Sequence, residues 1–474
     1  MWRVKTKMFS ISDIAHAHDC AGFSRRDFLR VGALGGLTLP ELLANKALAA
    51  KAGLPVRDKA VVLLFLSGGP PHIEFFDPKM TAPVEFRSIT GEVKTNIPGV
   101  TFGGTFPKLA KLTDKFSVVR SYASRNAGHR YDPVTVAGNP LKASMSALYT
   151  KVAGVNHPDT GMPSNTLILP EAIDPKLKLG GNFETKALPT LTQAGDLGAS
   201  FAAFNPAGGA DVNADMRLQI EPERLLDRRG LLGSLDSLRR DVDANGELES
   251  ADKYQQQAFD TITRGVAEAF DWTKEDPKTI ARYDTRRLFD QKKLQKYFDM
   301  KRVSNLLGLQ MLMARRMCEA GCGFVTVSDC GWDFHANNNS PKRMAGIWPM
   351  GGQVDHAVSA FIEDVHARGL SEKILLVVTG EMGRTPRLNK NGGRDHYGNL
   401  TTLLLSGGGL KMGQIVGASD RHASEPATRP YDPKHLMSTV MHTLFDIGKL
   451  RITDGIPKEV IDAITAGEPI AELV

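Results

Sequence analysis

The chain has 474 residues, of which 42% are hydrophobic and 24% are charged, so it is long enough to bury a large core. Its formal net charge is +6, but residues 1–49 contribute +3 of this, with seven Lys or Arg against four acids. No long basic run follows, so we expect no nucleic-acid partner.

The N-terminus carries an export pattern. Residues 24–29, SRRDFL, have the form of a twin-arginine signal, and Ala47-Leu48-Ala49 follows with the small-x-small pattern of a cleavage site. The sequence therefore predicts a signal peptide over residues 1–49 and a mature chain that is periplasmic or secreted. The alternative is an N-terminal amphipathic helix that happens to contain two adjacent arginines.

The apolar stretch between these two motifs covers residues 31–43 and is interrupted by Pro40 and Glu41. It is shorter than the roughly 20 apolar residues that a membrane-spanning helix needs. We therefore expect no stable membrane insertion.

Along residues 50–474, short apolar runs alternate with helical patterns. Strands are predicted at residues 61–66, 116–119, 166–169, 324–327, 374–379 and 401–405. Helices are predicted at residues 141–153, 303–320, 352–368 and 435–445. This alternation indicates an α/β domain with a largely parallel central sheet sandwiched by helices.

Residues 175–300 have a different character. Gly- and Ala-rich loops lead into polar helical segments at 221–243, 251–270 and 280–297, where apolar residues recur every three or four positions. We interpret this part as a helical insertion or lid packed on the sheet.

Polar side chains that can do chemistry follow the predicted strands. They are Ser67, His72, Glu74 and Asp77 after the first strand, His129 after the second, Asp329, Asp333 and His335 after the strand at 324, and Glu381 and His396 after the strand at 374. Because the carboxyl ends of parallel strands meet at one edge of a sheet, these groups are expected to converge. Imidazoles combined with carboxylates suit zinc, manganese or iron, whereas an all-oxygen set suits calcium or magnesium. Taken singly, each histidine is more often a surface or hydrogen-bonded residue.

Two arginines of the same region, Arg384 and Arg394, are candidates for bidentate binding of phosphate or sulfate. Their alternative role is ordinary pairing with Glu381 or Asp395.

Several motifs occur in a characteristic order: the twin-arginine leader, LSGGPPHIEFFDPK, GWDFH, TGEMGRTP, GRDHYGN and GQIVGASD. In this the chain resembles the bacterial domain-of-unknown-function-1501 family, of the alkaline phosphatase and sulfatase superfamily, over most of residues 60–447. The resemblance implies an alkaline-phosphatase-like fold, and it implies no activity because the family is uncharacterised.

The resemblance also implies a ligand set. Asp333, His335 and His396 match the ligands of the superfamily's first metal site, and Glu381 matches an Asp of the second. Met382 stands where that second site has a His, and a thioether is a poor ligand for a hard divalent metal.

The predicted function is that of an exported metal-dependent hydrolase acting on small or polymeric phosphate or sulfate esters. The expected cofactor is a divalent metal, zinc or manganese, with calcium as the alternative. The candidate catalytic residues are Ser67, Glu74, His129 and Glu381. The candidate anion-binding residues are Arg384 and Arg394. The candidate metal ligands are Asp333, His335, His396 and Glu381. The alternative is a non-catalytic metal- or ligand-binding envelope protein that keeps the fold, which Ser67, Pro71 and Met382 favour because each departs from the superfamily pattern.

Overall fold

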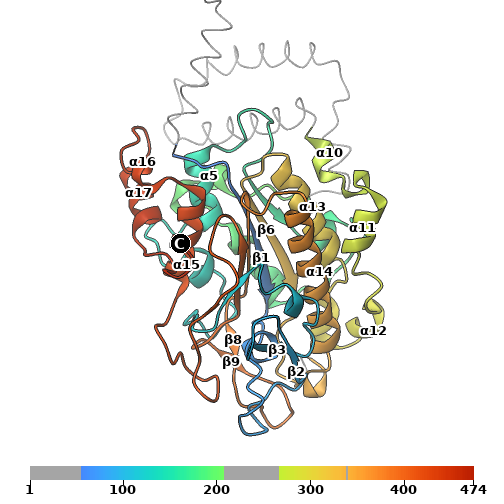
Figure 1. Ribbon diagram of the computed structural model, residues 1–474. Helices are drawn as coiled ribbons and strands as arrows, with labels where there is room; N and C mark the ends of the chain where they lie inside the picture. The colour runs from blue at the N-terminus through green and yellow to red at the C-terminus, as the bar shows by residue number, and fades with distance from the viewer. Residues whose placement is uncertain (1–54, 208–265, 338–339) are drawn as a thin grey trace, which may run out of the picture. The chain divides into compact units, whose positions relative to one another are not determined.

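The central sheet has seven strands in the order β11-β4-β10-β7-β1-β6-β5. Figure 1 shows two of them, β1 and β6, side by side. The computed structural model describes residues 55–207, 266–337 and 340–474. The strands are β1 (Ala60–Ser67), β4 (Ser117–Val119), β5 (Asn165–Ile168), β6 (Phe324–Cys330), β7 (Ile374–Thr379), β10 (Leu403–Gly407) and β11 (Ile415–Val416). Only β10 is antiparallel to its neighbours in this sheet; the other pairs are parallel. The mixed, largely parallel sheet confirms the predicted α/β architecture.

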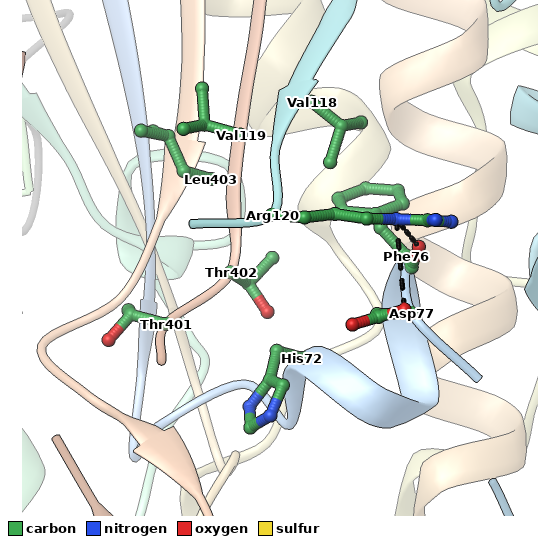
Figure 2. A pocket seen from close by; sticks show the side chains of 9 residues that line it. All are labelled: His72, Phe76, Asp77, Val118, Val119, Arg120, Thr401, Thr402 and Leu403. Carbon is green, nitrogen blue, oxygen red and sulfur yellow. Dashed lines mark hydrogen bonds and ion pairs between the residues drawn. The ribbon is translucent and has the colours of Figure 1, made fainter. Parts of the chain in front are cut away.

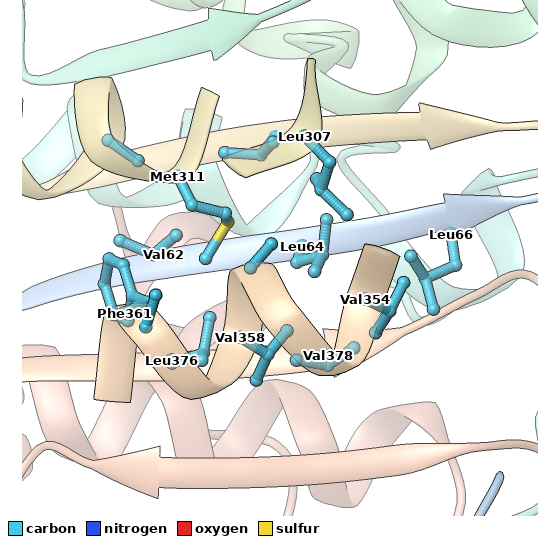
Figure 3. Packing of buried hydrophobic residues seen from close by; sticks show 14 of the residues in the cluster. Val62, Leu64, Leu66, Leu307, Met311, Val354, Val358, Phe361, Leu376 and Val378 are labelled. Carbon is cyan, nitrogen blue, oxygen red and sulfur yellow. The ribbon is translucent and has the colours of Figure 1, made fainter. Parts of the chain in front are cut away.

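Both faces of the sheet are covered, and β1 shows why its sequence is apolar throughout. Val62, Leu64 and Leu66 point to one face and pack against α13 (Leu307–Glu319) and α14 (Ile347–Ala367) (Figure 3). The alternate side chains of β1 belong to a second core cluster, which includes residues of α5 (Met145–Ala153), α15 (Pro433–Leu444) and α17 (Lys458–Thr465). A strand with helices on both sides has no solvent face and therefore no polar alternation.

The structure confirms the predicted strands and main helices and corrects some of their bounds. The helix expected over 303–320 begins at Leu307, because Val303 is extended and ends the short helix η8 (Phe298–Arg302). The helix expected over 352–368 begins earlier, at Ile347.

The predicted helix at 280–297 is two short helices, α11 (Pro277–Tyr283) and α12 (Gln291–Gln295). Asp284 is extended and ends α11, while the carboxylate of Asp290 caps the start of α12. The segment 221–243 and most of 251–270 lie outside the described residues.

The remaining elements are short. They are β2 (Glu92–Lys94), β3 (Thr101–Gly103), β8 (Gly383–Arg384), β9 (His396–Tyr397), α3 (His72–Phe75), α4 (Asp132–Thr135), α6 (Phe183–Ala187), α10 (Ala267–Phe270), α16 (Ile447–Leu450), η1 (Leu109–Lys111), η2 (Pro170–Ala172), η3 (Leu188–Thr192), η4 (Gly195–Leu197), η5 (Ala199–Phe201), η7 (Trp272–Lys274) and η9 (Lys342–Met344).

The chain divides between Leu54 and Pro55 into two units, and all described residues belong to the second. The predicted signal peptide lies outside the described residues and stays a prediction. Within the described residues, every helix is too short or too polar to cross a membrane.

The parallel register brings three strand ends together. Ser67 at the end of β1 lies opposite Cys330 of β6, and Phe65 lies opposite Thr379 of β7. The loops that begin at residues 68, 331 and 380 therefore leave the sheet at one edge, where ligand sites of parallel sheets form.

Candidate metal centre

Asp333 is the centre of this edge. Its carboxylate is buried, and its Oδ1 forms an ion pair with Nη2 of Arg384. The Nε2 atoms of His335 and His396 lie 3.1 and 3.4 Å from the same Oδ1, and Nε2 of His129 lies 3.8 Å from Oδ2. Burial opposes ionisation, but the contact with His335 and the charge of Arg384 outweigh it and hold the pKa of Asp333 well below its usual range.

Three of these side chains can hold one metal ion. Single ligand atoms of His129, Asp333 and His396 all lie within 4.8 Å of one another, and we call these three residues the metal cluster. The rings of His129 and His396 are in contact, with centroids 4.5 Å apart. Among the described residues, no other set of three or more His, Cys, Asp or Glu side chains brings its ligand atoms this close together.

The ring of His396 is fixed by a backbone carbonyl. Its Nδ1 lies 3.1 Å from the oxygen of Ala127, and because a carbonyl only accepts, Nδ1 must carry the hydrogen. In the neutral ring the lone pair is then on Nε2, which faces Asp333.

The ring of His129 is fixed by a carboxylate. Its Nδ1 lies 3.0 Å from Oε1 of Glu381, and both oxygens of Glu381 accept the backbone N–H of Gly68, at 2.9 and 3.2 Å. An ionised Glu381 accepts the Nδ1 hydrogen and leaves the lone pair of Nε2 facing Asp333, the arrangement found behind many metal-bound histidines. Burial raises the pKa of Glu381 to about 7 and lowers the pKa of His129 to about 4.

The Nε2 atoms of His129 and His396 are both buried and have no hydrogen-bond partner. A buried nitrogen without a partner is costly, and two that converge on an ionised carboxylate match the donor set of a divalent cation. The residues present therefore fit a metal.

His335 lies beside the metal cluster. Its Nδ1 is 2.6 Å from Oδ1 of Asp395, and its hydrogen bond with Asp333 is the main cause of its raised pKa. In this structure His335 lies between the carboxylates of Asp333 and Asp395. Its predicted role as a metal ligand stays a prediction.

The backbone of the β1 loop holds the centre together. Gly68 has φ +116°, and a Cβ there would lie 2.6 Å from the nitrogen of Asp333 and 2.7 Å from that of Trp332. Only glycine permits both this conformation and this contact. The pairing of β8 with β9 places Arg384 opposite His396 across two strands.

Arg384 does not present its guanidinium to a ligand. It is fully buried, and it donates to the carbonyl oxygens of Gly68, Gly69 and Arg394 as well as to Asp333. The expectation of an anion clamp is therefore corrected: Arg384 supplies the positive charge that faces Asp333.

The predicted roles of Arg394 in anion binding and of Glu74 in catalysis are also corrected. The two form a fully buried ion pair, with Nε and Nη2 of Arg394 at 3.0 and 2.9 Å from Oε1 of Glu74. The other Arg394 donors bind the backbone oxygens of Thr385, Pro386 and Arg87. Glu74 and Arg394 thus join the α3 region to the β8–β9 loop and stand apart from the metal cluster.

The predicted catalytic role of Ser67 is corrected as well. It ends β1, is fully buried, and its Oγ lies 3.4 Å from Oγ of Ser328. A hydroxyl enclosed in the sheet is not placed as an attacking group. Met382 is also fully buried and packs against Gly69.

His72 lines a separate small cavity (Figure 2). The cavity measures about 10 Å³, the size of a single water, and Asp77 and Arg120 also line it. The Nε2 of His72 lies 3.0 Å from the oxygen of Ala423, so His72 has a structural role. Asp329 is likewise structural, since it accepts the indole N–H of Trp332 at 2.9 Å.

Sequence reasoning missed three residues next to the centre. Phe183 stacks on His129 with ring centroids 4.1 Å apart. Glu184 pairs with Arg302 at 2.6 Å and accepts the N–H of Gly331 at 2.9 Å, so it fixes the loop that carries Asp333. Phe183 and Glu184 belong to the predicted insertion, Arg302 lies just beyond its end, and no local motif marks any of the three.

Comparison with known proteins agrees with the motifs. Residues 58–468 match the family described as "Protein of unknown function (DUF1501)". The chain belongs to this family.

No curated protein matches the DUF1501 chain. A solved structure that resembles it is the crystal structure of PsFucS1 sulfatase from Pseudoalteromonas sp., with 13% identity and a TM-score of 0.35. The alignment covers 90% of this chain and 75% of the sulfatase. A likeness at this level carries no argument about activity.

Proposed function

We propose that this DUF1501 protein is an exported, metal-dependent hydrolase of phosphate or sulfate esters. The observation that carries the proposal is the pair of buried, unpartnered Nε2 atoms of His129 and His396 that face the ionised carboxylate of Asp333. We infer the substrate class, phosphate or sulfate esters, from the resemblance to the alkaline phosphatase and sulfatase superfamily.

Two imidazoles and one carboxylate favour zinc or manganese over calcium, which takes a set of oxygen ligands. When bound, such a metal supplies a Lewis acid for the ester group. The protein holds His129 and His396 with their Nε2 lone pairs inward and keeps Asp333 ionised.

Glu381 acts as a positioning residue in this proposal. Its oxygens are taken up by His129 and the N–H of Gly68, so it orients the ring of His129. The buried position of Ser67 favours direct attack by water over a serine-linked intermediate.

A second function has a specific observation in its favour. Both arginines predicted to bind an anion are turned inward, Arg384 on Asp333 and Arg394 on Glu74, so neither is free to clamp an anionic ester. This supports a non-catalytic metal-binding envelope protein.

A metal assay followed by an ester panel separates the two. The mature chain, purified without chelator and loaded with zinc or manganese, is incubated with p-nitrophenyl phosphate, bis-p-nitrophenyl phosphate and p-nitrophenyl sulfate. The hydrolase predicts turnover of one ester class, lost in His396→Ala and kept in His422→Ala. Metal binding without turnover of any ester would favour the binding protein.

A further inference from the structure

A basic cavity lies away from the metal cluster. It measures about 390 Å³, within the size range of small-ligand pockets. Its charged lining comes from three segments, η1, the α11 region and α14, and consists of Lys108, Lys111, Arg282, Arg287, His356 and Glu363.

The cavity lies along α14 from its middle onward, beyond the helix end that follows the loop of Asp333. The loop after β6 carries Asp333 and leads into α14, which begins at Ile347. His356 and Glu363 follow nine and sixteen residues later, so at 1.5 Å per residue they lie about 14 to 24 Å along the helix. The cavity is therefore a second site and no extension of the first.

Among the side chains that line the cavity, positive charges outnumber negative ones. Its one carboxylate, Glu363, is 3.0 Å from Nη2 of Arg282. Within the described part of the chain, Lys108, Lys111 and Arg287 form no ion pair with an acid. Asp355 and Asp284 lie near Lys108 and Arg287 but form no salt bridge with them. The lining cations still outnumber the nearby acids that pair with them, and an anion in the cavity reduces their mutual repulsion.

The cavity has a built wall. His356 is buried and uses both ring nitrogens: Nε2 donates to the oxygen of Arg282 at 2.8 Å, and Nδ1 accepts from Nζ of Lys108 at 2.5 Å. Asp355 accepts the backbone N–H groups of Lys108 and Leu109, at 3.1 and 2.8 Å. These bonds fix the start of η1 and direct Lys108 toward the cavity.

We propose that the basic cavity binds a small anion that carries two or more phosphate or sulfate groups. Guanidinium and ammonium groups are the side chains that recognise such groups, and cations from separate segments match a ligand with more than one charged centre. This site is independent of the proposed ester hydrolysis.

The test is calorimetric titration of the mature chain with pyrophosphate, orthophosphate and sulfate. We expect one saturable site that prefers pyrophosphate. Lys111→Gln with Arg287→Gln should weaken pyrophosphate binding by about tenfold or more, since two charge-assisted contacts are lost. The control Arg429→Gln removes a charge from a surface pair with Glu468 and should leave the affinity unchanged.

The metal cluster is excluded as the binding place by His396→Ala, which should bind pyrophosphate as the parent does. Four results overturn the proposal: no binding by the parent chain, equal affinity for all three anions, parental affinity in the double variant, or loss of binding in His396→Ala. Thermal unfolding of each variant verifies that it is folded.

Discussion

The guanidinium of Arg384 lies against the carboxylate of Asp333, on the same oxygen that faces Nε2 of His335 and His396. An arginine thus occupies one side of a carboxylate that also belongs to the metal cluster. It keeps Asp333 ionised in a buried site, and it competes with any cation for that oxygen.

Arg384→Met tests this double role. In the presence of chelator we expect it to lower the free energy of unfolding by about 3–5 kcal/mol, because it leaves the Asp333 charge without its buried partner. Added zinc should then stabilise the variant more than the parent, since no guanidinium competes for Oδ1.

Urea unfolding with and without zinc measures both effects. The control is Arg429→Met, which breaks an exposed pair with Glu468 and should cost less than about 1 kcal/mol. Equal zinc stabilisation of Arg384→Met and the parent would show that the arginine does not compete with the metal.

Glu381→Gln tests the carboxylate behind His129. The amide oxygen still accepts a hydrogen bond, but the negative charge that fixes the imidazole is lost, so we expect metal affinity to fall by about 10–100-fold. Competition with a chromophoric chelator measures it, and Glu425→Gln, at an exposed carboxylate, is the matched control. Unchanged affinity in Glu381→Gln would remove Glu381 from the metal site altogether.

His72 makes stability depend on pH. Burial is the main cause that lowers its pKa to about 4; Asp77 is the nearby acid, and Arg394 and Lys79 are the nearby cations. The folded state therefore binds fewer protons than the unfolded state between about pH 4 and 6.5, so stability falls as the pH falls through this window. At about 1.4 kcal/mol per pKa unit, the loss is about 3 kcal/mol.

His72→Gln keeps a donor for the oxygen of Ala423 and cannot be protonated. Urea unfolding at several pH values should give a flatter profile between pH 4 and 6.5 for this variant than for the parent. Parallel profiles would mean that His72 is not the group responsible.

The sheet could be predicted from sequence because its strands are buried on both faces. The runs at 61–66 and 374–378 are apolar throughout, and each is followed within two residues by a glycine, so their place in a parallel sheet follows from local pattern. Their register then explains why Asp333, Glu381 and His396 come together, as the sequence led us to expect.

What each residue does there could not be predicted, because it depends on partners far away in the chain. Arg394 looks like an anion ligand until Glu74, 320 residues away, is found against it. His129 was expected to be catalytic, and its imidazole belongs to the metal cluster. Glu381 was expected to be a metal ligand, and its carboxylate lies behind the ring of His129. Hydrogen-bond direction, which no sequence pattern encodes, decides this.

The most direct test of the account is the metal content of the mature chain, purified without chelator and measured by inductively coupled plasma mass spectrometry. We expect about one zinc or manganese per chain in the parent and in His422→Ala, whose imidazole stacks on Phe86. His129→Ala and His396→Ala should each lose most of it, and His335→Ala shows whether that ring is a ligand. Parental metal content in both His129→Ala and His396→Ala would contradict the metal centre proposed for this protein.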